Sequence, residues 1–154
     1  MRVPTLPCLA LAMTLPAASL AAAPLPLIPL PEKVEATGSP FLLAKETVIQ
    51  ADEALGGEAN LLAAAIGARS GTAPKVVAAS GGAAAACIRL TVDPALPVKA
   101  EGYAFESSPA GVWIKGKDAT GAFYGAQTLL QLLPPAGAAA WATPVPVPGA
   151  RILD

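Results

Sequence analysis

The stretch that decides the fold is Gly121-Ala122-Phe123-Tyr124-Gly125-Ala126-Gln127-Thr128-Leu129-Leu130-Gln131-Leu132-Leu133-Pro134. Apolar residues recur in it at helical spacing, at Phe123, Ala126, Leu130 and Leu133, whereas Gln127 and Gln131 lie elsewhere around the helix. Asp118 or Thr120 can cap its start, and Pro134-Pro135 ends it. The stretch therefore predicts a helix with one face buried against a sheet.

Two glycines interrupt this helix, four residues apart. Glycine lowers helix propensity by about 1 kcal/mol relative to alanine, so Gly121 and Gly125 need a packing reason. We expect them to let the helix backbone approach the sheet closely.

Strand patterns precede the helix. Residues 102–107 and 111–116 read as a hairpin joined by Ser108-Pro109-Ala110, and residues 87–92 alternate as a half-buried strand with Ile88, Leu90 and Val92 on one face. Further upstream, residues 32–44 read as a hairpin that turns at Gly38-Ser39-Pro40, and residues 47–50 read as a short strand. Val76-Val77 follows Pro74 and Lys75, and the alternating prolines at 144, 146 and 148 predict an extended linker.

A first helix is predicted over residues 58–69. Asp52 can cap it, Gly71 follows its end, and Leu61, Leu62, Ala65 and Ile66 are expected on its buried side. Strands grouped around two helices, rather than alternating strictly with them, predict an α+β fold with one face of the sheet covered.

Several of these segments together resemble a known family. The strands Gly102–Glu106 and Gly111–Gly116, the turn Asp118-Ala119-Thr120-Gly121 and the run from Phe123 to Leu129 resemble the non-catalytic, zincin-like N-terminal domain of glycoside hydrolase family 20, the bacterial beta-N-acetylhexosaminidases. The resemblance extends from Leu27-Ile28-Pro29-Leu30-Pro31 to the strand Gly149–Asp154. It implies a mostly antiparallel sheet with two roughly parallel helices packed on one face.

The resemblance also implies where the chemistry of the family lies. In this family a (β/α)8 barrel, which needs about 250 residues, follows the domain and hydrolyses terminal N-acetylhexosamine residues by a substrate-assisted retaining mechanism. The printed sequence ends at Asp154. We therefore expect residues 22–154 to be an accessory domain whose partner is the barrel, with glycans bound through that barrel. The alternative is a stand-alone exported carbohydrate-binding or interaction module.

The adjacent acids Asp52 and Glu53 are the one pair that superficially resembles a glycosidase acid pair. They stand at a helix entrance, where capping and the helix dipole explain both, and the chain contains no histidine. The absence of histidine removes Ser-His and Cys-His nucleophile pairs and the common zinc sites. We predict no catalytic, cofactor-binding or metal-binding residue in this chain.

Two further features are open to a binding or reactive role. Trp113, Tyr103 and Phe105 lie on neighbouring strands, where they can form core, meet the barrel or stack on a sugar ring, and core packing is the expectation. Cys87 is expected to be a small strand residue and not a reactive thiol.

The N-terminus indicates the compartment. A positive start at Met1-Arg2, an apolar run from Leu6 to Leu15 and the small-residue site Ser19-Leu20-Ala21 predict a signal peptide over residues 1–21 and a periplasmic or secreted protein. Prolines within this region argue against a stable membrane span. Ten basic and eleven acidic residues leave a net charge of −1, which gives no electrostatic footprint for nucleic acid.

Overall fold

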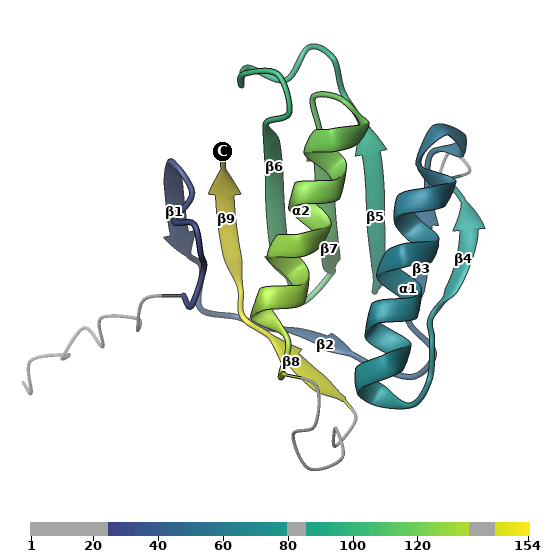
Figure 1. Cartoon of the computed structure of the whole chain (residues 1–154). Helices are drawn as coiled ribbons and strands as arrows, with labels where there is room; N and C mark the ends of the chain where they lie inside the picture. Colours follow the sequence, from purple (N-terminus) through teal and green to yellow (C-terminus); the bar gives the residue numbers. More distant parts are fainter. Residues whose placement is uncertain (1–24, 80–85, 136–143) are drawn as a thin grey trace, which may run out of the picture.

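The computed structural model describes residues 25–79, 86–135 and 144–154. These residues form two layers: a seven-stranded sheet, and two helices that lie side by side on one of its faces (Figure 1). The predicted signal peptide, residues 1–21, lies outside the described ranges. No helix within those ranges is long and apolar enough to cross a membrane.

The strands are β1 (Lys33–Ala36), β2 (Phe41–Leu43), β3 (Val48–Ala51), β4 (Lys75–Ala78), β5 (Cys87–Val92), β6 (Tyr103–Ser108), β7 (Gly111–Gly116), β8 (Val145–Val147) and β9 (Ala150–Leu153). The helices are the 3-10 helix η1 (Glu53–Leu55) and the α-helices α1 (Gly56–Ser70) and α2 (Ala119–Leu132).

The large sheet has the strand order β1-β9-β6-β7-β5-β3-β4, and β2 and β8 form a separate two-stranded sheet. The pairings β1–β9, β9–β6, β6–β7 and β2–β8 are antiparallel, whereas β7–β5, β5–β3 and β3–β4 are parallel. The predicted α+β class, with both helices on one face of the sheet, is therefore confirmed. The large sheet is mixed: its β1-β9-β6-β7 half is antiparallel and its other three pairings are parallel. The parallel pairing of β3 with β4 is that of a βαβ unit in which α1 is the crossover.

The predicted hairpin over residues 32–44 is wrong. Strand β1 pairs with β9, and β2 pairs with β8, so the two arms belong to different sheets. Gly38 has a left-handed φ of 87°, and Thr37 N donates to Gly149 O at 2.9 Å, which ties this segment to the other end of the chain. The predicted linker is also strand in part: Val145 and Val147 of β8 are buried, while Pro146 between them is exposed.

The start of α1 differs from the prediction. Asp52 makes no side-chain cap, because its Oδ2 accepts a hydrogen bond from Val92 N at 2.9 Å and η1 intervenes before Gly56. The prediction that Leu61 lies on the buried side of the helix is wrong, because this residue is 63% exposed. Leu62 next to it is 2% exposed, as predicted.

The buried face of α1 consists of Ala59, Leu62, Ala63 and Ile66, which recur at helical spacing, and Ala65 is only half-buried. Gly71 ends the helix in the left-handed conformation, as expected.

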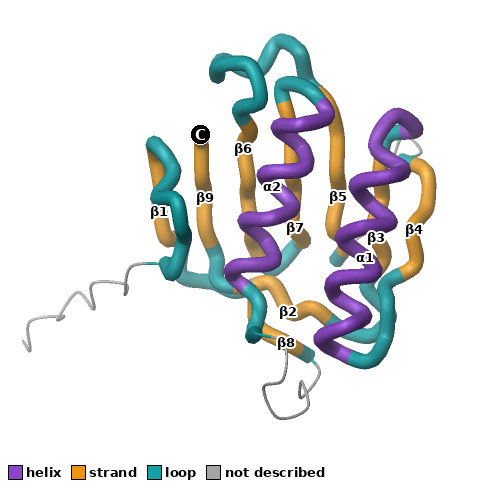
Figure 2. The backbone as a smooth tube through the Cα atoms, viewed as in Figure 1, coloured by secondary structure: helices purple, strands orange, loops and turns teal. Residues whose placement is uncertain are grey.

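Helix α2 closely follows its prediction. Asp118 is its N-cap, and the helix ends before Pro134. Leu130 and Leu133 are buried as expected, but Phe123 is only partly buried, and the fully buried Leu129 packs in the core instead. Figure 2 shows α2 lying over β6 and β7, and the core fills the space between this helix layer and the sheet.

The N-terminal segment of the described chain is fastened to both α2 and β9. Gln131 Oε1 accepts from Ile28 N at 2.8 Å, and Gln131 Nε2 donates to Ile28 O at 3.1 Å. Glu32 N donates to Asp154 Oδ1 at 2.9 Å. Leu27, immediately before Ile28, is buried in the core.

Candidate functional site

The turn at Asp118, on which the family resemblance rests most heavily, is a structural junction. Asp118 Oδ1 accepts from Gly121 N and Oδ2 accepts from Glu101 N, each at 2.8 Å. Hydrogen bonds from the backbone N–H groups of Gly121 and Glu101 hold the pKa of the Asp118 carboxyl below its usual value. Both oxygens are occupied, so this carboxylate anchors the helix start and the preceding loop and is not free for catalysis.

Glycines make this junction possible. A Cβ on Gly121 would lie 2.2 Å from Gly102 O, and a Cβ on Gly116 would lie 2.1 Å from Ala122 N. A Cβ on Gly125 would lie 2.5 Å from Ile114 Cγ2. The expected close approach of α2 to the sheet is confirmed, because no side chain fits where these backbones meet.

Asp52 and Glu53 have different surroundings in the structure. Asp52 binds Val92 N across the strand ends, and Glu53 is exposed in η1. Among the described residues no group of three or more Cys, Asp or Glu side chains is arranged to hold a metal ion.

Cys87 lies inside the protein as a structural residue. Its side chain is 1% exposed, and its Sγ lies 3.7 Å from Gln50 Oε1. Burial raises the pKa of the Cys87 thiol, only partly offset by the positive charge of Arg89. A buried thiol with a raised pKa is a poor nucleophile, which agrees with the expected structural role.

The structure separates the three aromatic residues. Tyr103 and Phe105 are buried in the core, where the Tyr103 hydroxyl and Thr128 Oγ1 are 2.6 Å apart and burial raises the pKa of Tyr103. Trp113 faces the other way, because it pairs with Glu106 while Phe105 pairs with Ile114. Tyr103 and Phe105 are therefore core residues, and the patch of three that stacking on a sugar would need does not form.

Trp113 lines a hollow on the helix-free face of the sheet. The hollow has a volume of about 260 Å³, and Leu96, Ala104, Glu106, Lys115 and Arg151 also contribute to its wall. Arg151 Nη2 lies 3.3 Å from Glu106 Oε1. The sequence predicted a possible binding role for Trp113 but not for the other residues of this wall. Alternation places Ala104 with Glu106 on one face of β6 and Trp113 with Lys115 on one face of β7, and the observed register brings the two pairs together.

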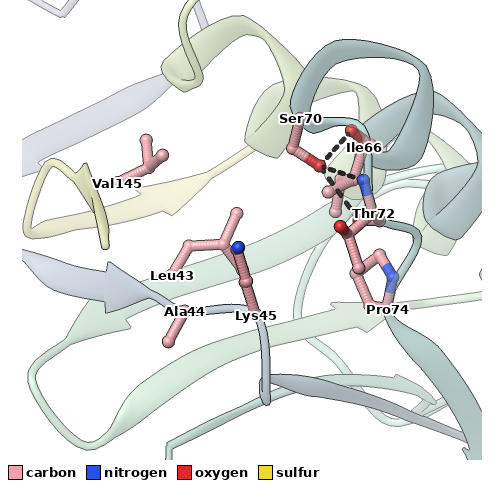
Figure 3. A pocket seen from close by; sticks show the side chains of 8 residues that line it. All are labelled: Leu43, Ala44, Lys45, Ile66, Ser70, Thr72, Pro74 and Val145. Carbon is pink, nitrogen blue, oxygen red and sulfur yellow. Dashed lines mark hydrogen bonds between the residues drawn. The ribbon is translucent and has the colours of Figure 1, made fainter. Parts of the chain in front are cut away.

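A second pocket lies at the end of α1, beside β2 and β8 (Figure 3). Leu43, Ile66, Pro74 and Val145 give it apolar walls. Ser70 Oγ lies 2.9 Å from both Ile66 O and Thr72 O, so its hydroxyl is used within the chain. This pocket is a gap between packed elements and presents no free polar group from Ser70 to a ligand.

Comparison with known proteins agrees with the fold. The family model described as glycosyl hydrolase family 20, domain 2, matches residues 25–154. A GH20 beta-N-acetylhexosaminidase from Streptomyces coelicolor A3(2) superposes with a TM-score of 0.72 at 34% identity, over 86% of this chain and 27% of that chain. A Streptomyces plicatus beta-hexosaminidase in complex with GlcNAc gives a TM-score of 0.69 at 36% identity, over 86% of this chain and 26% of that chain.

A curated relative matches over a shorter stretch. A beta-hexosaminidase from Porphyromonas gingivalis is 52% identical over 69 residues, which are 44% of this chain and 9% of the relative. The chain therefore spans about a quarter of the similar solved structures and less than a tenth of this relative. Because the family model covers every described residue, the chain belongs to glycosyl hydrolase family 20 and carries domain 2 of that family.

Proposed function

We propose that this chain is the accessory domain of an exported beta-N-acetylhexosaminidase, which hydrolyses terminal N-acetylhexosamine residues from glycans. The observation that carries the proposal is the match of domain 2 of the family to residues 25–154. The adjacent acids Asp52 and Glu53 have structural explanations, since Asp52 accepts a hydrogen bond from Val92 N and Glu53 is exposed in η1. The substrate-assisted retaining chemistry is therefore assigned to a catalytic barrel, and this domain supplies a folded scaffold beside it.

The outer face of the helix layer is the surface that we assign to the barrel. Leu61 on α1 is 63% exposed and Tyr124 on α2 is 44% exposed. The Tyr124 ring lies 5.8 Å from the ring of Phe123, which extends the apolar surface. Exposed large apolar side chains that gather on one layer are typical of a protein–protein contact.

The first test of the proposal is the activity of the chain by itself. Purified protein incubated with an aryl N-acetylglucosaminide should release no more phenol than a matched blank, because no acid pair is assembled. Turnover that disappears in an Asp52→Ala, Glu53→Ala double variant would place the chemistry in this chain and overturn the proposal.

A domain exchange tests the accessory role directly. In the Streptomyces coelicolor relative, the segment similar to residues 25–154 is replaced by this chain's residues. We expect the chimera to fold and hydrolyse the aryl substrate, whereas the relative without any such domain should be less stable to heat. A well-folded chimera that is no more heat-stable than the truncated relative would count against a scaffold role.

Export is part of the proposal and rests on the N-terminal sequence. We propose that a signal peptidase removes residues 1–21 and that the protein is periplasmic or secreted. Mass spectrometry of the exported protein should give the mass of a chain whose first residue is Ala22. A full-length mass in the membrane fraction would favour an N-terminal anchor.

A further inference from the structure

The hollow around Trp113 belongs to a row of side chains that crosses the helix-free face of the sheet. Strand register places Glu35, Arg151, Glu106, Trp113 and Arg89 opposite one another in succession on β1, β9, β6, β7 and β5. The indole therefore has a carboxylate on one neighbouring strand and a guanidinium on the other. Lys115 lies two residues further along β7, on the same face.

Ala104 makes the depression beside this row, because its side chain is short. It lines the hollow on β6 and pairs with Lys115, while Glu106 two residues away and Trp113 on β7 carry long side chains. Leu96 forms another wall, and Lys117 Nζ fixes its loop by donating to Leu96 O at 2.9 Å. A hollow of about 260 Å³ is smaller than the usual ligand pocket of about 300 to 1,000 Å³, so it suits one ring-sized group.

A neighbouring hollow extends the path along the sheet. It has a volume of about 240 Å³, shares Arg151 and Ile152 with the first, and is also lined by Lys33 and Glu35. The two hollows meet at Arg151. This continuity suits an extended, repeating ligand better than an isolated small molecule.

The charge around the indole is positive. Three cations on this face, Arg89, Lys115 and Arg151, outnumber the two acids of the row, Glu106 and Glu35. Glu106 pairs with Arg151, whereas Arg89 and Lys115 have no ion-pair partner within the described ranges. The chain as a whole has a net charge of −1, so this positive patch is a local feature that attracts an anion.

We infer that this face binds an anionic glycan, with the ring of one sugar seated against Trp113 and the carboxylates of the glycan held by Lys115, Arg151 and Arg89. The aromatic surface supplies apolar contact with the sugar ring, and the cations supply charge-assisted hydrogen bonds to carboxylates. Glu106, which pairs with Arg151 through Oε1, has further acceptor capacity for hydrogen bonds from sugar hydroxyl groups. This inference goes beyond the proposed function and does not rest on it.

Calorimetric titration of the 154-residue chain tests the inference. The probe is a hyaluronan oligosaccharide, which carries carboxylates and acetamido groups, and the neutral comparison is a chitin oligosaccharide of equal length. We expect saturable binding of hyaluronan, at least tenfold tighter than that of the chitin oligosaccharide, which weakens as salt is raised because screening acts on exposed charges. Equal affinity for both glycans, or no saturation with hyaluronan, would overturn the inference.

Two variants locate the site by shape. Trp113→Ala should weaken hyaluronan binding about tenfold or more, and Ala104→Leu should do the same by filling the floor of the hollow. The matched control is Tyr124→Ala, which removes an exposed aromatic side chain from α2, in the opposite layer. Thermal melts of all three establish that they are folded. Unchanged binding by folded Ala104→Leu would overturn the placement.

A second pair of variants locates the site by charge. Lys115→Gln should weaken binding several-fold and reduce its salt dependence, whereas Lys45→Gln, in the turn before β3, removes the same charge elsewhere and should change neither. If Lys115→Gln and Lys45→Gln weaken hyaluronan binding equally, the attraction is nonspecific and the inferred site is overturned. If the face instead contacts a protein domain, Trp113→Ala will leave glycan binding unchanged, which also overturns the inference.

Discussion

At the scale of single residues, glycines explain the sequence pattern around Asp118, where the chain resembles the family. Gly116 and Gly121 lie where the end of β7, the loop before β6 and the start of α2 meet without room for a Cβ. Asp118 then bonds to both the helix and the loop. The family resemblance in this region therefore reflects packing and capping and not a reaction.

Gly121→Ala should destabilise the domain. Its new methyl group would overlap Gly102 O at 2.2 Å, and forced overpacking of this kind costs about 1 to 3 kcal/mol or more. Gly57→Ala is the matched control, because it lies in α1 with nothing within 4 Å of the added Cβ and should gain about 0.4 to 1 kcal/mol. Urea unfolding midpoints measure both. Similar midpoints for the two variants would contradict the close contact.

Helix α2, at the scale of elements, should make stability depend on pH through its N-cap. The pKa of Asp118 is lowered in the folded state, so its stabilising effect is present above the unfolded pKa of about 3.9 and is lost as pH falls through the lower folded pKa. Asp118→Asn keeps an acceptor but cannot titrate. Its melting temperature should therefore fall less steeply than that of the wild type between pH 5 and pH 2.

The control for this experiment removes one carboxylate elsewhere. Glu46→Gln changes an exposed residue in the turn before β3. If Asp118→Asn and Glu46→Gln alter the acid dependence of melting equally, the N-cap is not its source.

The elements differ in how far sequence could predict them. The cap, glycines and proline of α2 are local signals, and they gave its bounds within a few residues. The hairpin expected over residues 32–44 failed because β9 and β8, the partners of β1 and β2, lie at the far end of the chain and leave no local signal. Alanines lie on both the buried and the exposed face of α1 and weaken its apolar periodicity. The sequence therefore could not show that Leu62 is buried and Leu61 is exposed.

The hollow around Trp113 shows the same limit for a site. Alternation along a strand shows which residues share a face, but a register shift of one residue moves a side chain to the opposite face. Only the observed pairing separates Trp113 from Phe105 and brings Arg151 of β9 beside Glu106. The prediction that Asp52 and Glu53 are structural rests on their position at a helix entrance, which is a local signal, whereas the positive patch required the whole sheet.

The fold, at the scale of the whole molecule, is tied together by Gln131. Its side chain forms two hydrogen bonds with Ile28, although Gln131 itself is exposed. Gln131→Ala should release the N-terminal segment and cost about 1 to 3 kcal/mol, at about 0.5 to 1.5 kcal/mol for each hydrogen bond. Hydrogen exchange at the Ile28 amide should accelerate.

Gln127, one turn earlier on α2, is the control for Gln131. It makes no side-chain hydrogen bond within the described ranges, so Gln127→Ala should leave exchange at Ile28 unchanged. Equal acceleration in both variants would indicate general loosening of the helix end and not the loss of a specific clamp.

The position of β9 sets the order in which the domain can fold. Among the described strands, β1 pairs only with β9. Lys33 has to find Leu153, 120 residues later in the sequence, so closure of this contact is slow and comes late. Pulsed hydrogen exchange should show β1 protected together with β9, after the β6–β7 hairpin, and protection of β1 in a chain that ends before Gly149 would contradict this order. A ribosome therefore has to finish β9 before β1 has its partner, so β1 stays unpaired until synthesis of this domain reaches Leu153.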